Sequence, residues 1–236
     1  MTSITSICVL NTSLIFKENI YILSPNPFLN MVDRYSNIKK VLKDFDKVQG
    51  KTATIVGLQG VGIVVAELLA RNGFNLRIID KGRVYLEELP TQTVYLEEDV
   101  TKFKAKQAKK RLEEINKEVK IKAFHEELTE DTEYLLDSDI VIECTSNKES
   151  SDVVHSYCLK NEIPVIYAHT YKDVSYIIVE NKEENYKDVK TYDIKKDGLL
   201  ANSVFITAGY VFTLVTKILS GEKVNKSYKI DASNLK

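Results

Sequence analysis

The sequence contains few cysteines, and their spacing suits neither a disulfide framework nor a zinc site. Its three cysteines are Cys8, Cys144 and Cys158, and no two of them form a CxxC pair. A disulfide-stapled domain and a tetracysteine zinc site are therefore excluded. We expect no zinc, and we expect a reducing, cytoplasmic location in which the cysteines stay free thiols.

The sequence also lacks an excess of either charge. It has 33 Lys and Arg residues against 34 Asp and Glu residues, which gives a net charge of −1. This balance argues against a general nucleic-acid or membrane-surface role. Internal repeats and low-complexity tracts are missing too, and a length of 236 residues suits one α/β domain or one and a half.

The first 30 residues lack the marks of a signal peptide, because they have no basic leading segment and no small-residue cleavage site. We expect translation to start at Met31, so that residues 1–30 are an untranslated leader or a loose arm. The alternative is an extra edge strand over residues 20–23. The expected domain spans residues 31–222, and residues 223–236 are expected to form a C-terminal tail.

A glycine cluster between two apolar strand patterns organises the chain. Residues 52–80 read TATIVGLQGVGIVVAELLARNGFNLRIID, with glycines at 57, 60 and 62 and an acid at Asp80. Glycines let a turn approach a phosphate, the next helix N-terminus offers unpaired N–H groups, and an acid about twenty residues on can take ribose hydroxyls. We expect a nucleotide-binding βαβ unit. The alternative is a plain βαβ crossover with a packing glycine.

The glycine spacing differs from that of the dinucleotide-binding dehydrogenases. Their pattern would place glycines at positions 57, 59 and 62, but position 59 is Gln and Gly60 is extra. A dinucleotide-dependent oxidoreductase or a plain NAD-binding module is thus a competing hypothesis, and Gln59 argues against it.

The rest of the sequence alternates helix and strand patterns, which predicts a doubly wound, mostly parallel sheet with helices on both faces. Helices are expected over residues 35–48, 104–116, 131–136 and 149–161, and strands over residues 119–124, 139–144, 165–168 and 174–180. Residues 199–219 are apolar nearly all round. They predict a helix buried against the sheet or a partner subunit rather than a membrane span.

Two loops follow predicted strands, at the edge where open α/β sheets bind their ligands. Residues 81–102 are irregular, which indicates a site-forming loop rather than a linker. Thr145, Ser146 and Asn147 come directly after the apolar strand over residues 139–144. We expect both loops to border the same site.

Several short motifs occur in a fixed order along the chain. They are RYS at 34–36, GLQGVG at 57–62, LPTQ at 89–92, FKA at 103–105, ECTSN at 143–147 and IPVIYA at 163–168. Together they resemble the ThiF/MoeB family, the adenylyltransferases that activate ubiquitin-like and sulfur-carrier proteins. The resemblance covers roughly residues 33–222 and implies a ThiF-type, Rossmann-like nucleotide-binding fold.

The resemblance implies a reaction and its participants. In the family, a flexible Gly-Gly carboxylate attacks the α-phosphate of ATP and gives an acyl adenylate and pyrophosphate. ATP and Mg²⁺ are therefore the implied cofactors, and a small ubiquitin-like or sulfur-carrier protein with a Gly-Gly tail is the implied partner. Family habit also implies a homodimer, or a heterodimer with a ThiF-like paralogue.

The resemblance also assigns roles by position. Implied nucleotide-binding residues are Gly57, Gly60 and Gly62 at the phosphates, Asp80 at the ribose, and Ser146 and Asn147 in the loop after the fourth strand. Lys104, Gln92 and Arg34 are the implied catalytic residues, with Lys104 facing the phosphates. A solvated lysine at a helix start is the alternative reading of Lys104.

The sequence departs from the family at three positions. Asn37 stands where a second arginine is usual, Thr91 where the loop usually reads Arg-Gln, and Ser146 where an aspartate usually binds the metal. Each loss removes charge stabilisation from phosphoryl chemistry. A degenerate subunit that binds nucleotide and pairs with an active paralogue is therefore a second hypothesis. Substitute carboxylates would be Asp139, Glu143 or Asp152, and we expect the first two to be buried or misdirected.

The remaining cysteines and histidines offer no convincing nucleophile. No cysteine follows Cys158, so nothing resembles the thioester cysteine of the full ubiquitin-activating enzymes. Cys144 is expected to be a small core residue. His155 and Cys158 are neighbours on a helix face, but no orienting acid is evident for a Cys/His pair. His169 is expected to be a satisfied strand-end histidine, with a role facing the nucleotide or the substrate tail as the alternative.

Overall fold

The computed structural model describes residues 8–10, 13–16, 19–21, 33–145, 147–180, 198–225 and 227–233. The chain divides into two units, Met1–Lys43 and Asp44–Lys236. The first unit has strands β1 (Cys8–Leu10), β2 (Ser13–Phe16) and β3 (Asn19–Tyr21) and helix α1 (Ser36–Val41). Because β3 pairs antiparallel with β2, the strand considered near residue 20 belongs to a separate three-stranded sheet.

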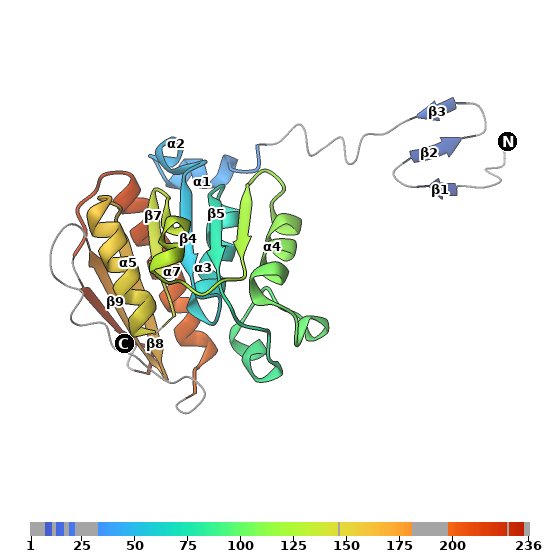
Figure 1. Ribbon diagram of the computed structural model, residues 1–236. Helices are drawn as coiled ribbons and strands as arrows, with labels where there is room; N and C mark the ends of the chain where they lie inside the picture. The colour runs from blue at the N-terminus through green and yellow to red at the C-terminus, as the bar shows by residue number, and fades with distance from the viewer. Residues whose placement is uncertain are drawn as a thin grey trace. The chain divides into compact units, whose positions relative to one another are not determined.

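The second unit is built on a seven-stranded sheet (Figure 1). Its strands are β4 (Thr52–Val56), β5 (Asn75–Ile79), β6 (Ile121–Phe124), β7 (Ile140–Glu143), β8 (Val165–Tyr171), β9 (Val174–Glu180) and β10 (Ser227–Asp231). Their order is β10-β9-β8-β7-β4-β5-β6. The strands from β8 to β6 are parallel, and β9 and β10 are antiparallel to their neighbours. The predicted mostly parallel sheet is confirmed.

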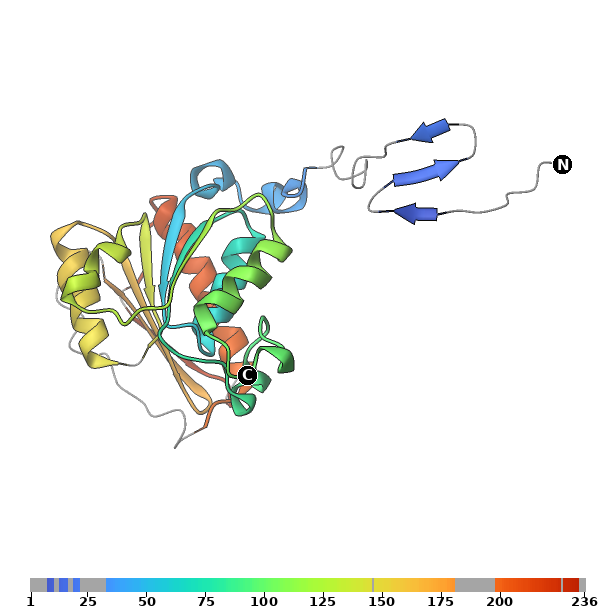
Figure 2. The same cartoon turned by 45° about the vertical axis from the view of Figure 1, so that its right-hand side comes forward.

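Helices cover both faces of this sheet, as Figure 2 shows. On one face lie α3 (Val61–Arg71), α4 (Lys104–Ile115) and α7 (Ala201–Leu219). On the other lie α5 (Lys148–Lys160) and the 3₁₀ helix η4 (Glu130–Leu136). Since both faces are covered, every residue of β7 is buried, as its continuous apolar pattern predicts.

The helix expected over residues 35–48 is interrupted. Helix α1 ends at Val41, Leu42 has an extended backbone (ψ 94°), and a short helix α2 (Phe45–Val48) follows. Val41 is 84% exposed, whereas Phe45 and Val48 are buried. The prediction of one continuous helix was therefore wrong, because the apolar positions at its centre have no common buried face.

Helix α7 was expected to be buried against the sheet or a partner subunit, and the structure shows it packed on the sheet side along one face. One face packs on α3 and the sheet and buries Val204, Ala208 and Val211. The opposite face leaves Phe205 44% and Tyr210 39% exposed. Within the described part of the chain, α7 is the one helix long and apolar enough to cross a membrane by length and composition alone.

The segment expected to be a tail and the loop after β5 both contain regular structure. Residues 227–231 form β10 and pair with β9 at the edge of the sheet. The loop over residues 81–102 contains two 3₁₀ helices, η2 (Leu86–Thr91) and η3 (Glu97–Asp99). It leaves the carboxyl end of β5 and leads into α4, so it borders the edge where ligands bind.

Candidate functional site

The strand order places a crevice between β4 and β7. The chain runs from β4 through β5 to β6 on one side, and from β7 to β8 on the other. Neighbouring strands whose connections leave in opposite directions form the topological switch point at which open α/β sheets bind ligands. The loops after Val56 and Glu143 meet there.

The glycine turn after β4 has the tight geometry that its sequence predicts. Gly57 and Gly60 have positive φ angles of 88° and 53°, a backbone conformation that favours glycine. A Cβ atom on Gly62 would lie 1.9 Å from the carbonyl oxygen of Gly57. Helix α3 can therefore begin this close to the glycine turn only with glycine at 62, and a helix N-terminus at this position is suited to a phosphate.

Asp80 is fixed at the carboxyl end of β5 by two backbone donors. One carboxylate oxygen accepts the N–H of Leu58 at 2.7 Å, and the other accepts the N–H of Gly82 at 2.6 Å. Each oxygen keeps a second acceptor site, because a carboxylate offers about four in all. Asp80 is thus held beside the glycine turn with acceptor capacity to spare.

These elements surround a cavity of about 290 Å³. Its walls come from the glycine turn, the end of β5, the loop after β5, the start of α4 and the loop after β7, and include Gly57, Gln59, Asp80, Gly82, Tyr85, Glu88, Lys104, Cys144, Thr145 and Asn147. Five residues assigned from sequence lie at this site, Gly57, Asp80, Lys104 and Asn147 on the walls and Gly62 against Gly57. Gly60 belongs to the same turn, and a Cβ atom added to it would lie 2.9 Å from the side chain of Leu199.

Lys104 lines the cavity, but its side chain is not solvated. It is the first residue of α4, its side chain is 5% exposed, and its Nζ lies 2.8 Å from Oε2 of Glu88. Glu88, in η2, is 7% exposed. The reading of Lys104 as a solvated helix-start lysine was therefore wrong, and in this structure its charge is balanced by a buried carboxylate on the cavity wall.

Gln92 lies behind this ion pair. It is buried, and its Nε2 is 3.4 Å from Oε2 of Glu88. Its Oε1 is buried and has no hydrogen-bond partner among the described residues. The burial of Tyr95, reinforced by the charges of Asp80, Glu88 and Asp99, raises the pKa of its hydroxyl well above the ordinary value. The loop after β5 therefore gathers negative charge around a single buried lysine.

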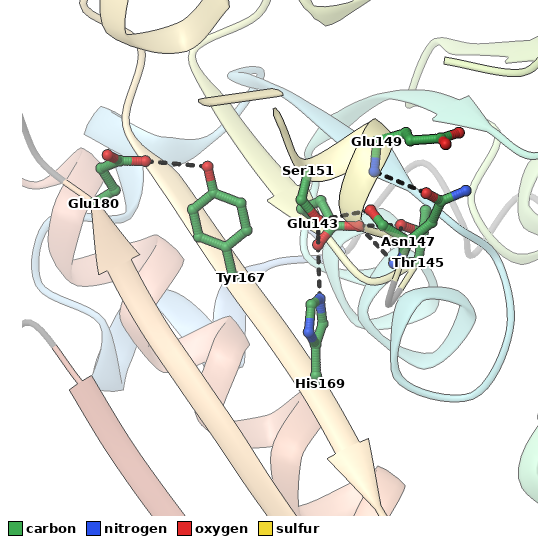
Figure 3. A network of polar contacts seen from close by, with 8 residues as sticks. All are labelled: Glu143, Thr145, Asn147, Glu149, Ser151, Tyr167, His169 and Glu180. Carbon is green, nitrogen blue, oxygen red and sulfur yellow. Dashed lines mark hydrogen bonds and ion pairs between the residues drawn. The ribbon is translucent and has the colours of Figure 1, made fainter. Parts of the chain in front are cut away.

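The loop after β7 is anchored from beneath by Glu143 (Figure 3). Thr145 donates its N–H and its hydroxyl to Oε1 of Glu143, and Ser151 donates its hydroxyl to Oε2. His169 lies 2.6 Å from Oε2. Burial alone would raise the pKa of Glu143, but His169 and the Thr145 hydrogen bonds hold this pKa below its ordinary value. His169 is thus a satisfied, buried histidine on β8.

Asn147 closes the same loop by capping α5. Its side-chain oxygen accepts the N–H of Glu149 at 2.9 Å, as Figure 3 shows, which satisfies one orphan donor of the helix end. Ser146, the other residue assigned to this loop, lies outside the described residues. Arg34 belongs to the Met1–Lys43 unit, so its role at the site stays a prediction.

The cysteines differ from one another in exposure. Cys144 lines the cavity and is only partly buried, but burial, with the charge of Glu143, raises the pKa of its thiol well above the ordinary value, which supports its assignment as a non-nucleophile. Cys158 is 1% exposed, and burial raises the pKa of its thiol to about 12. His155 lies 2.8 Å from Glu180 rather than activating Cys158. Tyr167 donates its hydroxyl to the other oxygen of Glu180 at 3.0 Å (Figure 3).

The three carboxylates considered as substitute metal ligands have other partners. Asp139 pairs with Lys51 at the amino end of the sheet, Glu143 is occupied beneath the loop, and Asp152 pairs with Lys148 along α5. Within the described ranges, no three His, Cys, Asp or Glu residues form a group that could hold a metal ion. A nucleotide-bound Mg²⁺ needs fewer protein ligands, since one or two carboxylates and the phosphates suffice.

A family model decides what kind of protein has this arrangement. The model described as ThiF family matches residues 35–235. The chain belongs to the ThiF family. It is 30% identical to a molybdopterin-synthase adenylyltransferase of Haemophilus influenzae over 155 residues, which are 62% of this chain and 64% of that protein.

Other curated relatives carry related names. The chain is 31% identical to a sulfur carrier protein ThiS adenylyltransferase of Bacillus subtilis over 126 residues, 51% of this chain and 38% of that protein. It is 30% identical to SUMO-activating enzyme subunit 2 of Dictyostelium discoideum over 146 residues, 59% of this chain and 22% of that protein. The chain thus spans less than two thirds of the length of these relatives.

Solved structures show the same ThiF-type fold. A crystal structure of E. coli MccB has a TM-score of 0.74 at 20% identity and covers 87% of this chain and 70% of that chain. A crystal structure of PaaA has a TM-score of 0.74 at 21% identity and covers 97% of this chain and 76% of that chain. At this identity the likeness concerns the fold alone.

Two features of this ThiF-family site are missed by sequence reasoning. The first is Glu88, directly before LPTQ, and its ion pair with Lys104. The second is the pairing of Glu143 with His169, which lie on neighbouring strands β7 and β8. The sequence signal for the second is a pair of buried polar residues near the ends of two otherwise apolar strands.

Proposed function

We propose that this chain binds ATP and adenylates the C-terminal glycine of a small ubiquitin-like or sulfur-carrier protein with a Gly-Gly tail. The observation that supports it most directly is the cavity at the switch point, where the glycine turn and Asp80 lie side by side in a member of the ThiF family. The names of the curated relatives point to the same reaction class.

In the proposed reaction, a carboxylate oxygen of the carrier's last glycine attacks the α-phosphorus of ATP. A bond from that oxygen to phosphorus forms, the bond to the β-phosphate oxygen breaks, and pyrophosphate leaves. The protein's part is to position the two reactants and to neutralise the phosphates. Lys104 and Arg34 would supply positive charge, Gln92 would support the loop, and Asp80 would accept the ribose hydroxyls. Mg²⁺ bound with the nucleotide would neutralise phosphate charge.

A second function is favoured by one specific observation, the ion pair that neutralises Lys104. With Lys104 bound to Glu88 and with Asn37 and Thr91 in place of arginines, the chain would bind nucleotide and act through an active paralogue. Thr91 is buried and donates its hydroxyl to the carbonyl of Glu88, so it serves the loop. The exposed face of α7, with Phe205 and Tyr210, is the surface we propose for a homodimer or such a heterodimer. We propose a cytoplasmic location.

Magnesium-dependent exchange of labelled pyrophosphate into ATP tests the proposed reaction. We expect exchange by the purified chain only when a carrier with a Gly-Gly tail is present, and no exchange with a carrier lacking its last glycine. Absence of exchange with every Gly-Gly carrier of the same genome would refute adenylation. Robust exchange by the single chain would instead refute the paralogue-dependent function. Comparing ATP with NAD affinity on the same preparation tests the oxidoreductase hypothesis.

A further inference from the structure

The cavity is unusual for a phosphate site because its charged walls are mainly acidic. Four carboxylates and two lysines line it, namely Asp80, Glu88, Glu126 and Glu127, with Lys81 and Lys104. Each of the two lysines already has a carboxylate partner, Glu127 for Lys81 and Glu88 for Lys104. Two more carboxylates than lysines therefore face a ligand that is itself highly negative.

The two ion pairs differ in their contact with water. Side chains of Lys81 and Glu127 are 60% and 47% exposed, so solvent and salt screen them. Side chains of Lys104 and Glu88 are 5% and 7% exposed, so they are screened much less. The pair has no net charge while it is intact, so Glu88 becomes a weakly screened negative charge in the cavity only when Lys104 leaves it.

Free ATP that drew Lys104 to its phosphates would meet the carboxylate of Glu88 as a like charge. If Lys104 turned to the phosphates, Glu88 would lose the cation that is paired with it and remain buried beside a polyanion. A divalent cation between Glu88 and a phosphate oxygen removes both costs, and Mg²⁺ is commonly held by one or two carboxylates together with substrate phosphates. The residues present therefore fit a nucleotide-bound Mg²⁺.

The side chain behind Glu88 offers an independent sign of a missing ligand. Gln92 directs its Nε2 at Glu88, while its buried Oε1 lacks a hydrogen-bond partner among the described residues. Buried polar atoms are normally paired, and an exception calls for an ion, a water or a ligand. Gln92 is not one of the residues that line the cavity, so a water bound beside Glu88, rather than the nucleotide, would pair with this amide oxygen.

We propose that Glu88 makes nucleotide binding depend on a divalent cation, by sharing Mg²⁺ with the phosphates while Lys104 leaves Glu88 and turns to the phosphates. The proposal rests on the nucleotide-binding half of the proposed function and does not require adenylation. It assigns to Glu88, on the loop after β5, the metal-ligand role that Ser146 cannot fill at the loop after β7.

Titrating the full chain with ATP, by calorimetry, in Mg²⁺ and separately in EDTA tests this assignment. For the unaltered chain we expect Mg²⁺ to tighten ATP binding at least about tenfold, since the carboxylate that Lys104 leaves behind is a like charge that opposes the free nucleotide. Glu88→Gln should bind ATP in EDTA about tenfold more tightly than the unaltered chain does, because one buried negative charge is gone. Its Mg²⁺ dependence should fall to within about twofold.

A matched control is Glu127→Gln, which makes the same chemical change in the same cavity at an exposed pair. It should retain the Mg²⁺ dependence of the unaltered chain. Because Glu88→Gln leaves Lys104 buried without its partner, a double variant, Glu88→Gln with Lys104→Gln, removes both charges. It should also lose the Mg²⁺ dependence, and thermal melting reports whether each variant is folded.

The outcomes separate this assignment from the proposed adenylation. If Glu88→Gln and the double variant both keep the full Mg²⁺ dependence, the assignment is overturned even when pyrophosphate exchange occurs. If the dependence disappears in both variants while no carrier supports exchange, the assignment stands and adenylation falls. If the unaltered chain binds no ATP in either buffer, both are overturned.

Discussion

Replacing Gly62 by alanine tests how closely α3 contacts the glycine turn. In most helices this change raises the free energy of unfolding, but here we expect it to lower it. Gly62 lies in the first turn of α3, and its φ is not positive, so alanine suits the backbone. On helix propensity alone the change would stabilise the fold by about 1 kcal/mol. The new Cβ, however, would lie 1.9 Å from the Gly57 carbonyl oxygen.

The size of the effect follows from how far the backbone must move. Ordinary contacts begin at 3.4 Å, so the turn and the helix must separate by about 1.5 Å (3.4 minus 1.9). Both are packed, with Leu58 and Ile63 fully buried, and overpacking such a core costs about 1–3 kcal/mol or more. The contact is with backbone, which no rotamer change can relieve, so we take the upper end of this range, about 3 kcal/mol. After the propensity gain of about 1 kcal/mol, we expect Gly62→Ala to lower the free energy of unfolding by about 2 kcal/mol.

Gly209→Ala is the matched control. Gly209 also lies in a helix, α7, but no heavy atom lies within 4 Å of its added Cβ. There the propensity term acts alone, and we expect the free energy of unfolding to rise by about 0.5–1 kcal/mol. Urea denaturation followed by circular dichroism measures both variants. A Gly62→Ala protein as stable as Gly209→Ala would show that the turn and the helix are not in contact.

Three further outcomes can be checked. The pKa of Glu143 is lowered in the fold, so the ionised carboxylate stabilises the fold above pH 4.5, and this stabilisation is lost as pH falls below that value. The urea midpoint of Glu143→Gln should therefore fall less steeply with acid than that of the unaltered chain. Equal slopes would contradict the pairing with His169. Cys158 should resist alkylation at pH 8 until the protein is denatured, because burial raises the pKa of its thiol to about 12. Peptide mass spectrometry detects the label, and rapid labelling of the native protein would contradict the burial. If the proposed dimer forms through α7, Phe205→Glu should halve the molar mass measured by light scattering, whereas Leu159→Glu on the exposed face of α5 should leave it unchanged. A dimer that survives both changes would place the interface elsewhere.

Local patterns predict the central sheet because its strands are continuous apolar runs. The predicted strand over residues 174–180 matches β9, and the helix expected over residues 149–161 matches α5 within one residue at each end. Strand β10 is missed because its residues alternate between exposed and half-buried, and its only partner, β9, lies about fifty positions earlier in the chain. Pairing over such a separation leaves no local signal.

The site is predicted where one backbone position dictates the residue type, and it is missed where side chains from distant segments meet. Gly57 and Gly62 are recognisable because only glycine tolerates their conformation or contact. The ion pair of Lys104 is not recognisable from the sequence, because Glu88 reaches it from a 3₁₀ helix whose direction no local pattern specifies. The exposed face of α7 is missed for a related reason: apolar composition does not reveal which side packs against α3.

The capped loop after β7 has a consequence for how the cavity can change shape. Thr145 is tied to Glu143 by two hydrogen bonds, and Asn147 is tied to the first turn of α5. This wall is therefore preorganised, and a ligand loses little conformational entropy by ordering it. The opposite wall is a 3₁₀ helix, whose hydrogen-bond geometry is poorer than that of an α-helix. Any closure on a nucleotide would thus proceed as a one-sided movement, with η2 swinging towards a stationary β7 edge.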